Sequence, residues 1–169
     1  MEVTRIDEGL WRWSVRDGET GHEMASAYLE HGAEIVLVDP ILPPAGEDRE
    51  RFGRALARDM ARLGGSVHVL LTRVNDPRDA DALVRMTAGT LWAPGDPLPS
   101  GIGMHPTGIA GEVAWWSHVH RALMPGRALA AGPDGVLTAA PGADRAALIA
   151  LRPAVIIPSV GPMERIAPQ

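Results

Sequence analysis

The chain has 169 residues, enough for one domain with a sizeable core, and we expect a single domain over residues 1–169. Its 16 basic residues, all of them Arg, are outnumbered by 21 acidic residues, and the net charge of −5 argues against nucleic acid as a partner. The absence of Cys excludes a disulfide framework, a thiolate nucleophile and a Cys-ligated zinc ion. Without a leader pattern or an apolar run of about 20 residues, the sequence predicts a cytoplasmic protein with no membrane partner.

The N-terminal part of the sequence predicts strands. Residues 3–16 alternate apolar and polar around a turn signal at residues 7–9, which is typical of a hairpin. Further strands are predicted at residues 25–30 and 34–39, and the second is an apolar, buried strand that ends on Asp39. Prolines follow this strand and exclude a helix directly behind it.

Helical spacing replaces this pattern between residues 47 and 63. The apolar residues that recur at this spacing are Phe52, Leu56, Met60 and Leu63. An arginine-rich face lies opposite them, and we interpret it as a solvated surface because acidic residues are interleaved with it. The pair Gly64-Gly65 ends this helix. A buried strand at 67–72 and a polar loop then lead to a second helix over 78–88, with Pro77 near its first position.

The remaining elements are short. Strands are predicted at residues 91–93, 112–116, 121–124, 136–138 and 154–157. A turn at Pro133-Asp134-Gly135 precedes the fourth of them, and a third helix over 143–151 precedes the last. Strands come first and then alternate with helices, without a repeat or a domain boundary, so the sequence predicts an α/β or α+β architecture.

Five Trp residues supply most of the aromatic mass. Trp11 and Trp13 share one face of their predicted strand, because side chains at i and i+2 point the same way. Trp115 and Trp116 are adjacent and must point to opposite faces. One of this second pair therefore needs cover from a helix, a loop or a second subunit, so a homodimer is one interpretation.

Four segments carry a resemblance to a known family. Their sequences are Leu37-Val38-Asp39-Pro40, residues 70–78 (LLTRVNDPR), residues 121–127 (RALMPGR) and Ile156-Ile157-Pro158-Ser159-Val160-Gly161. In this order and spacing they resemble the landmarks of the metallo-β-lactamase fold superfamily of metal-dependent hydrolases. The resemblance covers nearly the whole chain. It implies an αββα sandwich, with two facing mixed sheets flanked by helices and an active site at one edge between the sheets.

Within this resemblance the metal ligands are replaced. The superfamily's H-x-H-x-D-H motif, which supplies most ligands for zinc or iron, falls on Arg73, Asn75, Pro77 and Arg78. The bridging Asp of the family falls on Arg127, and its late His falls on Val160. Only Asp39, at a supporting position, matches. The region of the third ligand is harder to place, and His118 or His120 could lie near it.

These replacements remove the chemistry of the family. Zinc and iron need deprotonated oxygen or imidazole nitrogen donors, whereas the guanidinium groups of Arg73, Arg78 and Arg127 are always protonated and repel a cation. Val160 and Pro77 offer no donor at all. Without a metal, nothing lowers the pKa of a water from about 15.7 toward about 7, which is how such sites make hydroxide. We therefore expect no metal cofactor and no hydrolysis of the family's kind.

Two interpretations of the remaining polar residues stay open. The candidate pocket comprises Asp39, Arg73, Asn75, Arg78, His118, His120 and Arg127, and arginines in such a pocket could bind a carboxylate or phosphate. Alternatively, the arginines pair with Asp39, Asp76 and Asp79 in a structural network or point into solvent. His118 and His120 share a strand face and, with His105 and Glu112, could hold a relocated zinc or iron ion, although half-exposed strand positions explain them as well.

The sequence thus favours a degenerate metallo-β-lactamase-like domain that binds a small anion or serves as an interaction or regulatory module. The alternative is a working hydrolase with a relocated metal site or a metal-free mechanism. Stoichiometric bound metal would favour the enzyme, and an arginine-lined pocket holding phosphate or carboxylate would favour the binder. A fold without two facing sheets would instead indicate an unrelated α/β domain.

Overall fold

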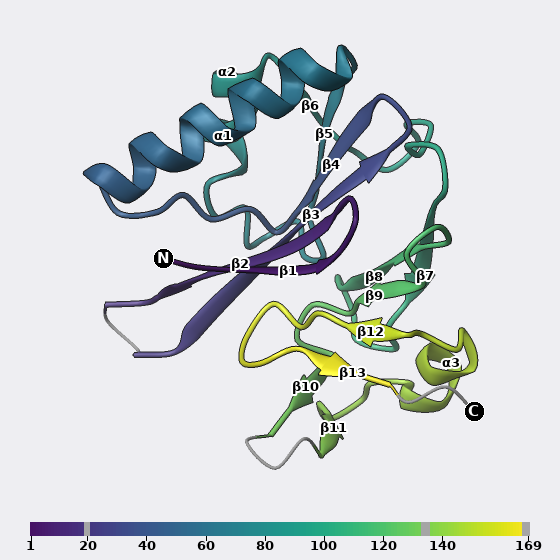
Figure 1. Cartoon of the computed structure of the whole chain (residues 1–169). Coiled ribbons are helices and arrows are strands. Elements are labelled where there is room, and N and C mark those ends of the chain that lie inside the picture. Colours follow the sequence, from purple (N-terminus) through teal and green to yellow (C-terminus); the bar gives the residue numbers. More distant parts are fainter. Residues whose placement is uncertain (19–20, 133–135, 167–169) are drawn as a thin grey trace.

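Two β-sheets face each other at the centre of the molecule, and helices cover their outer faces (Figure 1). The computed structural model describes residues 1–18, 21–132 and 136–166, so the predicted turn at Pro133-Asp134-Gly135 lies outside the described residues. The order of layers is helix, sheet, sheet, helix, as the resemblance implies.

The first sheet has six strands in sequence order. They are β1 (Glu2–Asp7), β2 (Leu10–Arg16), β3 (Glu23–His31), β4 (Glu34–Val38), β5 (Val67–Leu70) and β6 (Thr90–Leu91). Strands β1 to β4 are antiparallel neighbours, whereas β4, β5 and β6 are parallel. Parallel neighbours need crossover connections, which α1 (Glu47–Leu63) and α2 (Ala80–Thr87) provide.

The second sheet has five strands in the order β13-β12-β9-β8-β7. They are β7 (Ile102–Pro106), β8 (Val113–Ser117), β9 (Ala122–Met124), β12 (Val155–Ile156) and β13 (Glu164–Arg165). Strands β10 (Leu129–Ala131) and β11 (Leu137–Ala139) form a separate pair, and α3 (Arg145–Ala150) follows them. Strands β9 and β12 are parallel, so both end at the same edge of this sheet.

Alternation along the strands builds three apolar clusters. On β4, Val36 and Val38 face the second sheet, whereas Ile35 and Leu37 face α1 and α2. Trp115 lies in the cluster between the sheets, and its neighbour Trp116 lies in the outer cluster with Leu148 of α3. Trp116 is thus covered from within the chain, and its burial does not require a second subunit.

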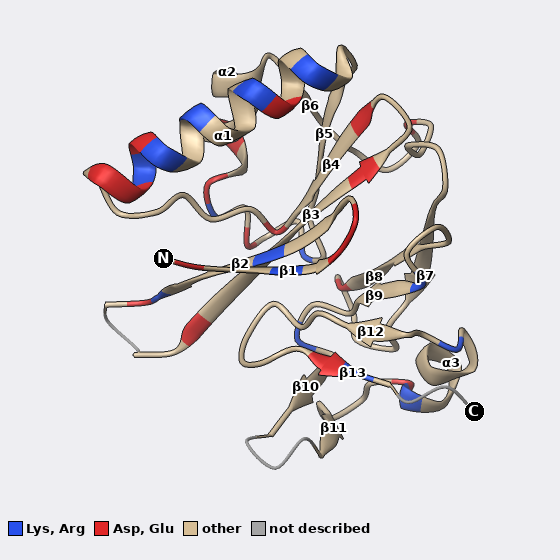
Figure 2. Ribbon diagram, in the orientation of Figure 1, with Lys and Arg blue, Asp and Glu red and all other residues tan. Residues whose placement is uncertain are grey.

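Helix α1 forms as its pattern predicts. It ends at Gly64, whose φ of 70° is a left-handed conformation that glycine adopts at little cost. Arg51 and Arg54 pair with acidic residues four positions earlier, Glu47 and Glu50, and Figure 2 shows blue and red alternating along the helix. At 17 residues it is the longest helix, and none in the described ranges is both long and apolar enough to cross a bilayer.

Helix α2 begins later than predicted. Asp79 precedes its first residue, Ala80, and the φ of Arg78 is 50°, which is not helical. Pro77 therefore lies in the loop before the helix rather than at its first position. This irregular stretch is what turns the side chain of Arg78 back toward the sheets.

Candidate functional site

The predicted site residues other than His118 and His120 lie at one end of the sandwich, where β4, β5, β9 and β12 end. Asp39 follows β4, and Thr72 and Arg73 follow β5. Glu112 precedes β8 and reaches the same place, because the amide of Val113 donates to the carbonyl of Thr72 at 2.9 Å. We call this group the arginine site; its members are Asp39, Thr72, Arg73, Asp76, Arg78, Glu112 and Arg127.

Asp39 is the buried carboxylate of the arginine site, with 4% of its surface exposed. Its Oδ1 accepts from the amide of Thr72 at 2.8 Å, and its Oδ2 accepts from Thr72 Oγ1 at 2.6 Å. Burial raises the pKa of Asp39, and the nearby guanidinium of Arg78 opposes that rise. Both carboxylate oxygens are therefore engaged in tying the ends of β4 and β5 together.

Arg78 joins the two sheets. Its Nη1 donates to the carbonyl oxygens of Ala25 at 2.8 Å and Asp39 at 2.9 Å, and its Nη2 donates to that of Ser159 at 3.1 Å. Ala25 belongs to β3, Asp39 follows β4, and Ser159 follows β12 of the other sheet. Burial lowers the pKa of Arg78 and the carboxylate of Asp39 raises it, but a guanidinium stays charged under all physiological conditions.

The segment after β12 closes this end of the sandwich. The amide of Ala25 donates to the carbonyl of Ser159, and Val160 forms a β-bridge with Met24. Arg12, which is buried, donates from Nη2 to the carbonyl of Gly161 at 2.8 Å. The cavity left beside Asp39 and Ser159 measures about 10 Å³, which is room for about one water.

Glu112 is a second buried carboxylate of the arginine site, with 6% of its surface exposed. Its Oε1 accepts from the amide of Arg127 at 2.9 Å, and its Oε2 lies 3.9 Å from Nε of Arg73. Gly126 has a φ of +63°, and a Cβ there would come within 2.8 Å of both Glu112 Oε1 and Thr72 Oγ1, so only glycine fits. This role of Glu112, which the sequence grouped with histidines, could not be predicted, because no local motif signals it.

Arg127 and Asp76, the most exposed pair of the arginine site, form an ion pair. Arg127 Nη2 donates to Asp76 Oδ2 at 3.0 Å, and both side chains are partly exposed. Asn75 and Pro77 lie in the exposed part of the loop. Each of the three arginines therefore faces a carboxylate or backbone carbonyls, which supports the structural-network interpretation. The predicted partner Asp79 instead accepts from the amide of Leu42 at 2.8 Å.

The structure does not bring His118 and His120 to the arginine site. They follow β8, at the end opposite Glu112, and the strand's five residues span about 15 Å. His120 lies against His31, with ring centroids 5.3 Å apart, and Trp116 Nε1 donates to His118 Nδ1 at 3.2 Å. The candidate pocket and the relocated metal set of His105, Glu112, His118 and His120 both joined residues from opposite ends of the molecule.

His31 makes the stability of the fold depend on pH. The ring is buried, its Nε2 lies 3.1 Å from Ser117 Oγ, and burial followed by the neighbouring His120 and His118 lowers its pKa, while Glu34 opposes this. Because the folded pKa lies below the unfolded one, stability is complete above about pH 6.5 and falls as the pH drops below that value. Burial lowers the pKa of His105 too, and adds to the same trend.

Urea unfolding followed by tryptophan fluorescence at pH 8 and pH 5.5 measures this loss. His31→Gln is expected to reduce the difference in unfolding free energy between the two pH values below that of the parent chain. An unchanged difference in His31→Gln would contradict the assignment.

The residues of the arginine site do not fit a zinc or iron ion. Arg73, Arg78 and Arg127 offer only donors, and both oxygens of Asp39 already accept hydrogen bonds. In the described ranges no group of three or more His, Asp or Glu side chains is arranged to hold a metal ion. A metal site of the kind that the resemblance implies is therefore not compatible with this donor set.

Comparisons with known proteins agree with this architecture. No protein-family model matches the chain, and no curated protein has a significantly similar sequence. Among solved structures, a metallo-β-lactamase from Erythrobacter litoralis is similar with a TM-score of 0.65 and 15% identity over 96% of this chain and 90% of its own. The metallo-β-lactamase from Hirschia baltica has a TM-score of 0.54 and 15% identity over 97% of this chain and 92% of its own. The one from Pontibacter korlensis has a TM-score of 0.55 and 14% identity over 97% of this chain and 93% of its own.

At this identity a structural likeness shows the fold alone, because function depends on the site residues and not on the scaffold. The two facing mixed sheets, the outer helices and the coverage of nearly the whole chain agree with each other. The chain therefore has the metallo-β-lactamase fold.

Proposed function

We propose that this chain is a non-catalytic domain with the metallo-β-lactamase fold, in which arginine cross-links stand where the family holds its metals, and that it acts by binding. The observation that carries the proposal is the guanidinium of Arg78, which donates to three carbonyl oxygens from three separate segments. The positive charge at the edge between the sheets is thus supplied by a side chain of the protein, the guanidinium of Arg78.

Hydrolysis by a metal-activated water needs a metal ion with an open coordination position and a base or ligand set around it. The arginine site offers neither, because its buried carboxylates accept hydrogen bonds from Thr72, Arg127 and their surroundings. The cavity beside Asp39 and Ser159, about 10 Å³ in volume, is too small for a substrate. The chain is therefore expected not to hydrolyse a chromogenic β-lactam, the substrate class that the names of the similar structures imply for those proteins.

A small anion is also not favoured at the arginine site. An added carboxylate or phosphate would have to displace Asp76 from Arg127 or Glu112 from Arg73. Since those pairs are already formed within the chain, we assign this cluster a structural role. Binding, as an interaction or regulatory module, then falls to another surface.

Metal content tests the proposal. The purified, untagged protein is loaded with zinc, iron(II) and manganese, desalted and analysed by elemental analysis, and less than about 0.1 metal ion per chain is expected, because no set of deprotonated ligands is available. One tightly held ion per chain would contradict the proposal. His118→Ala and His120→Ala would then show whether the histidines hold it, and hydrolase assays would follow.

A further inference from the structure

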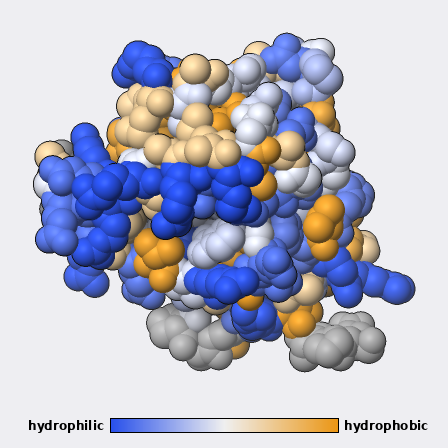
Figure 3. Space-filling model, turned by 45° about the horizontal axis from the view of Figure 1, so that its top comes forward, coloured by the Kyte–Doolittle hydropathy of each residue, from blue (hydrophilic) through white to orange (hydrophobic). Residues whose placement is uncertain are grey.

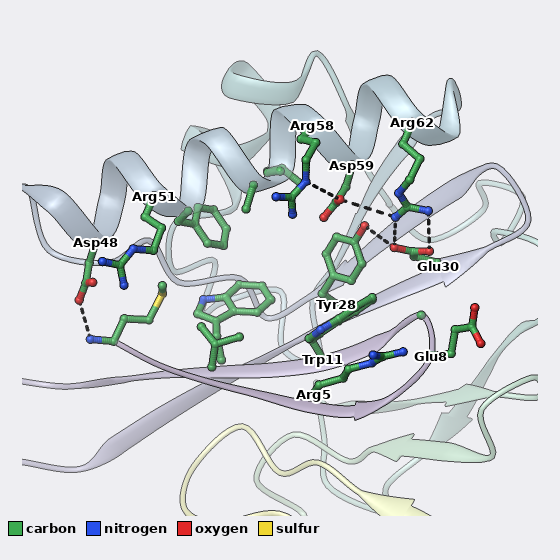
Figure 4. A pocket seen from close by; sticks show the side chains of 17 residues that line it. Arg5, Glu8, Trp11, Tyr28, Glu30, Asp48, Arg51, Arg58, Asp59 and Arg62 are labelled. Atoms are coloured by element: carbon green, nitrogen blue, oxygen red, sulfur yellow. Dashed lines mark hydrogen bonds and ion pairs between the residues drawn. The ribbon is translucent and has the colours of Figure 1, made fainter.

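A groove of about 760 Å³ runs between α1 and the outer face of β1 and β2, and we call it the α1 groove (Figure 4). It shares no residue with the arginine site. Strand β1 is at the edge of the six-stranded sheet with β2 beside it, and residues of both strands and of α1 line the groove. In the view with the top of the molecule turned forward, hydrophobic side chains are visible between strongly hydrophilic ones (Figure 3).

The floor of the α1 groove is aromatic and rigid. Trp11 and Tyr28 pack edge to face with their ring centroids 5.2 Å apart, and Trp13 packs on Phe52 at 5.4 Å. Trp13 Nε1 also donates to the carbonyl of Ile41 at 2.7 Å, which fixes the ring. Because these rings already hold one another, a flat apolar ligand would meet a preformed surface and little ordering would be needed.

Most charges on the rim are neutralised within the chain. Glu30 pairs with Arg62, and Asp59 lies 3.6 Å from Arg62 and 3.5 Å from Arg58. Asp48 pairs with the N-terminal amino group at 2.8 Å. Arg51 pairs with Glu47, which does not line the groove, at 2.9 Å. These pairs leave two charged side chains of the rim to account for.

Arg5 and Glu8 are those two. Within the described part of the chain no carboxylate pairs with Arg5; its guanidinium lies 5.9 Å from the centroid of the Trp11 ring, and its Nε is 3.4 Å from the carbonyl of Asp7. A guanidinium stacked on an indole keeps an edge of N–H groups free for a carboxylate. Glu8 has no cationic partner in the same ranges and disfavours a second negative charge nearby.

We propose that the α1 groove binds a small organic monoanion, with an apolar body lying on Trp11 and its aromatic neighbours and a carboxylate held by Arg5. The guanidinium of Arg5, which has no carboxylate partner among the described residues, favours a negatively charged ligand. The carboxylate of Glu8 nearby disfavours a second negative charge on that ligand. The aromatic floor favours an apolar body. This proposal goes beyond the non-catalytic role and does not depend on the fate of the metal site.

Isothermal titration calorimetry with 2-naphthoate and decanoate tests the proposal, with 2-naphthamide as the uncharged match. Saturable binding of at least one of the two acids at one site per chain is expected, with 2-naphthamide binding at least about tenfold more weakly than 2-naphthoate. Arg5→Gln is expected to weaken binding of the acids about tenfold and to leave binding of the amide unchanged. Trp11→Ala is expected to weaken all three ligands.

Two control variants test whether arginines outside the α1 groove contribute to binding. Arg54→Gln removes a guanidinium from α1 outside the groove, and Arg127→Gln removes one from the arginine site; both are expected to bind the acids like the parent chain. Circular dichroism confirms that each variant is folded, and Arg5 is exposed, so its replacement leaves the fold intact. Absence of saturable binding of both acids, equal binding by Arg5→Gln, or loss of binding in Arg127→Gln would each overturn the proposal.

Discussion

Replacing Arg78 by Met is expected to lower the free energy of unfolding by about 3–5 kcal/mol, the usual loss when one partner of a buried charged cluster is removed. The change leaves the carbonyl oxygens of Ala25, Asp39 and Ser159 without their donor and leaves the Asp39 carboxylate without its neighbouring positive charge. The loss is a large share of the 5–15 kcal/mol typical of a domain. Urea unfolding monitored by tryptophan fluorescence measures it.

Arg127→Met is the matched control. Its guanidinium pairs with Asp76 at the surface, where such a pair contributes about 0–1 kcal/mol. Arg78→Lys should fall between the two variants, because one ammonium group cannot reproduce the planar fork that reaches three acceptors. Equal stability of the Arg78→Met and Arg127→Met proteins would show that Arg78 does not join the sheets.

Replacing Trp115 by Ala is expected to cost about 3–5 kcal/mol of unfolding free energy, because it opens a cavity between the two sheets. Trp115 is fully buried there and packs edge to face on Trp92, with ring centroids 5.2 Å apart. Thermal unfolding followed by circular dichroism, combined with urea titration, measures the loss.

Trp115→Phe separates the packing of the aromatic ring from the effect of the indole N–H group. The indole Nε1 of Trp115 has no hydrogen-bond acceptor in the part of the chain that the structure describes, so Phe removes a buried polar group and keeps much of the apolar volume. This variant is expected to retain most of the stability that Trp115→Ala loses. A loss as large as that of Trp115→Ala would contradict this expectation and would mean that the core depends on the full shape of the indole ring.

The strands that could be predicted most clearly from sequence are those with continuous runs of apolar residues. The apolar runs of β4 and β5 lie between helices and the second sheet, so both faces are apolar and the signal is strong. Strand β7 was not predicted, because it contains Gly103, His105 and Pro106 and forms through its pairing with β8. Strands β10 and β13 were missed as well; each pairs over only two or three residues.

The arginine site was predictable only in part. The spacing of Arg73 and Arg78 on one loop, and the position of Arg127 after a strand, brought these residues together correctly. The partners of Arg78 could not be predicted, because backbone carbonyls of Ala25 and Ser159 carry no signature in the sequence. His118 was assigned to the wrong end of the sandwich. The sequence pattern of β8 does not indicate which end of the strand lies beside the loop at Arg73.

The α1 groove could not be predicted either. The prediction that the arginine face of α1 is solvated is confirmed for Arg54, Arg58 and Arg62, whose side chains are exposed. Arg58 and Arg62 also line the α1 groove, because the sheet places β1 and β2 opposite this helix, which a pattern on the helix alone does not show. Trp11 and Trp13 sharing a face was the one sequence observation that pointed there.

The cross-link at Arg78 also changes what the fold needs from its surroundings. A link between two sheets that runs through a bound metal ion is broken when a strong chelator takes the ion. The guanidinium of Arg78 is part of the chain and keeps its charge at any physiological pH. From the proposed function we therefore expect the free energy of unfolding to be the same in zinc-depleted and in zinc-supplemented buffer.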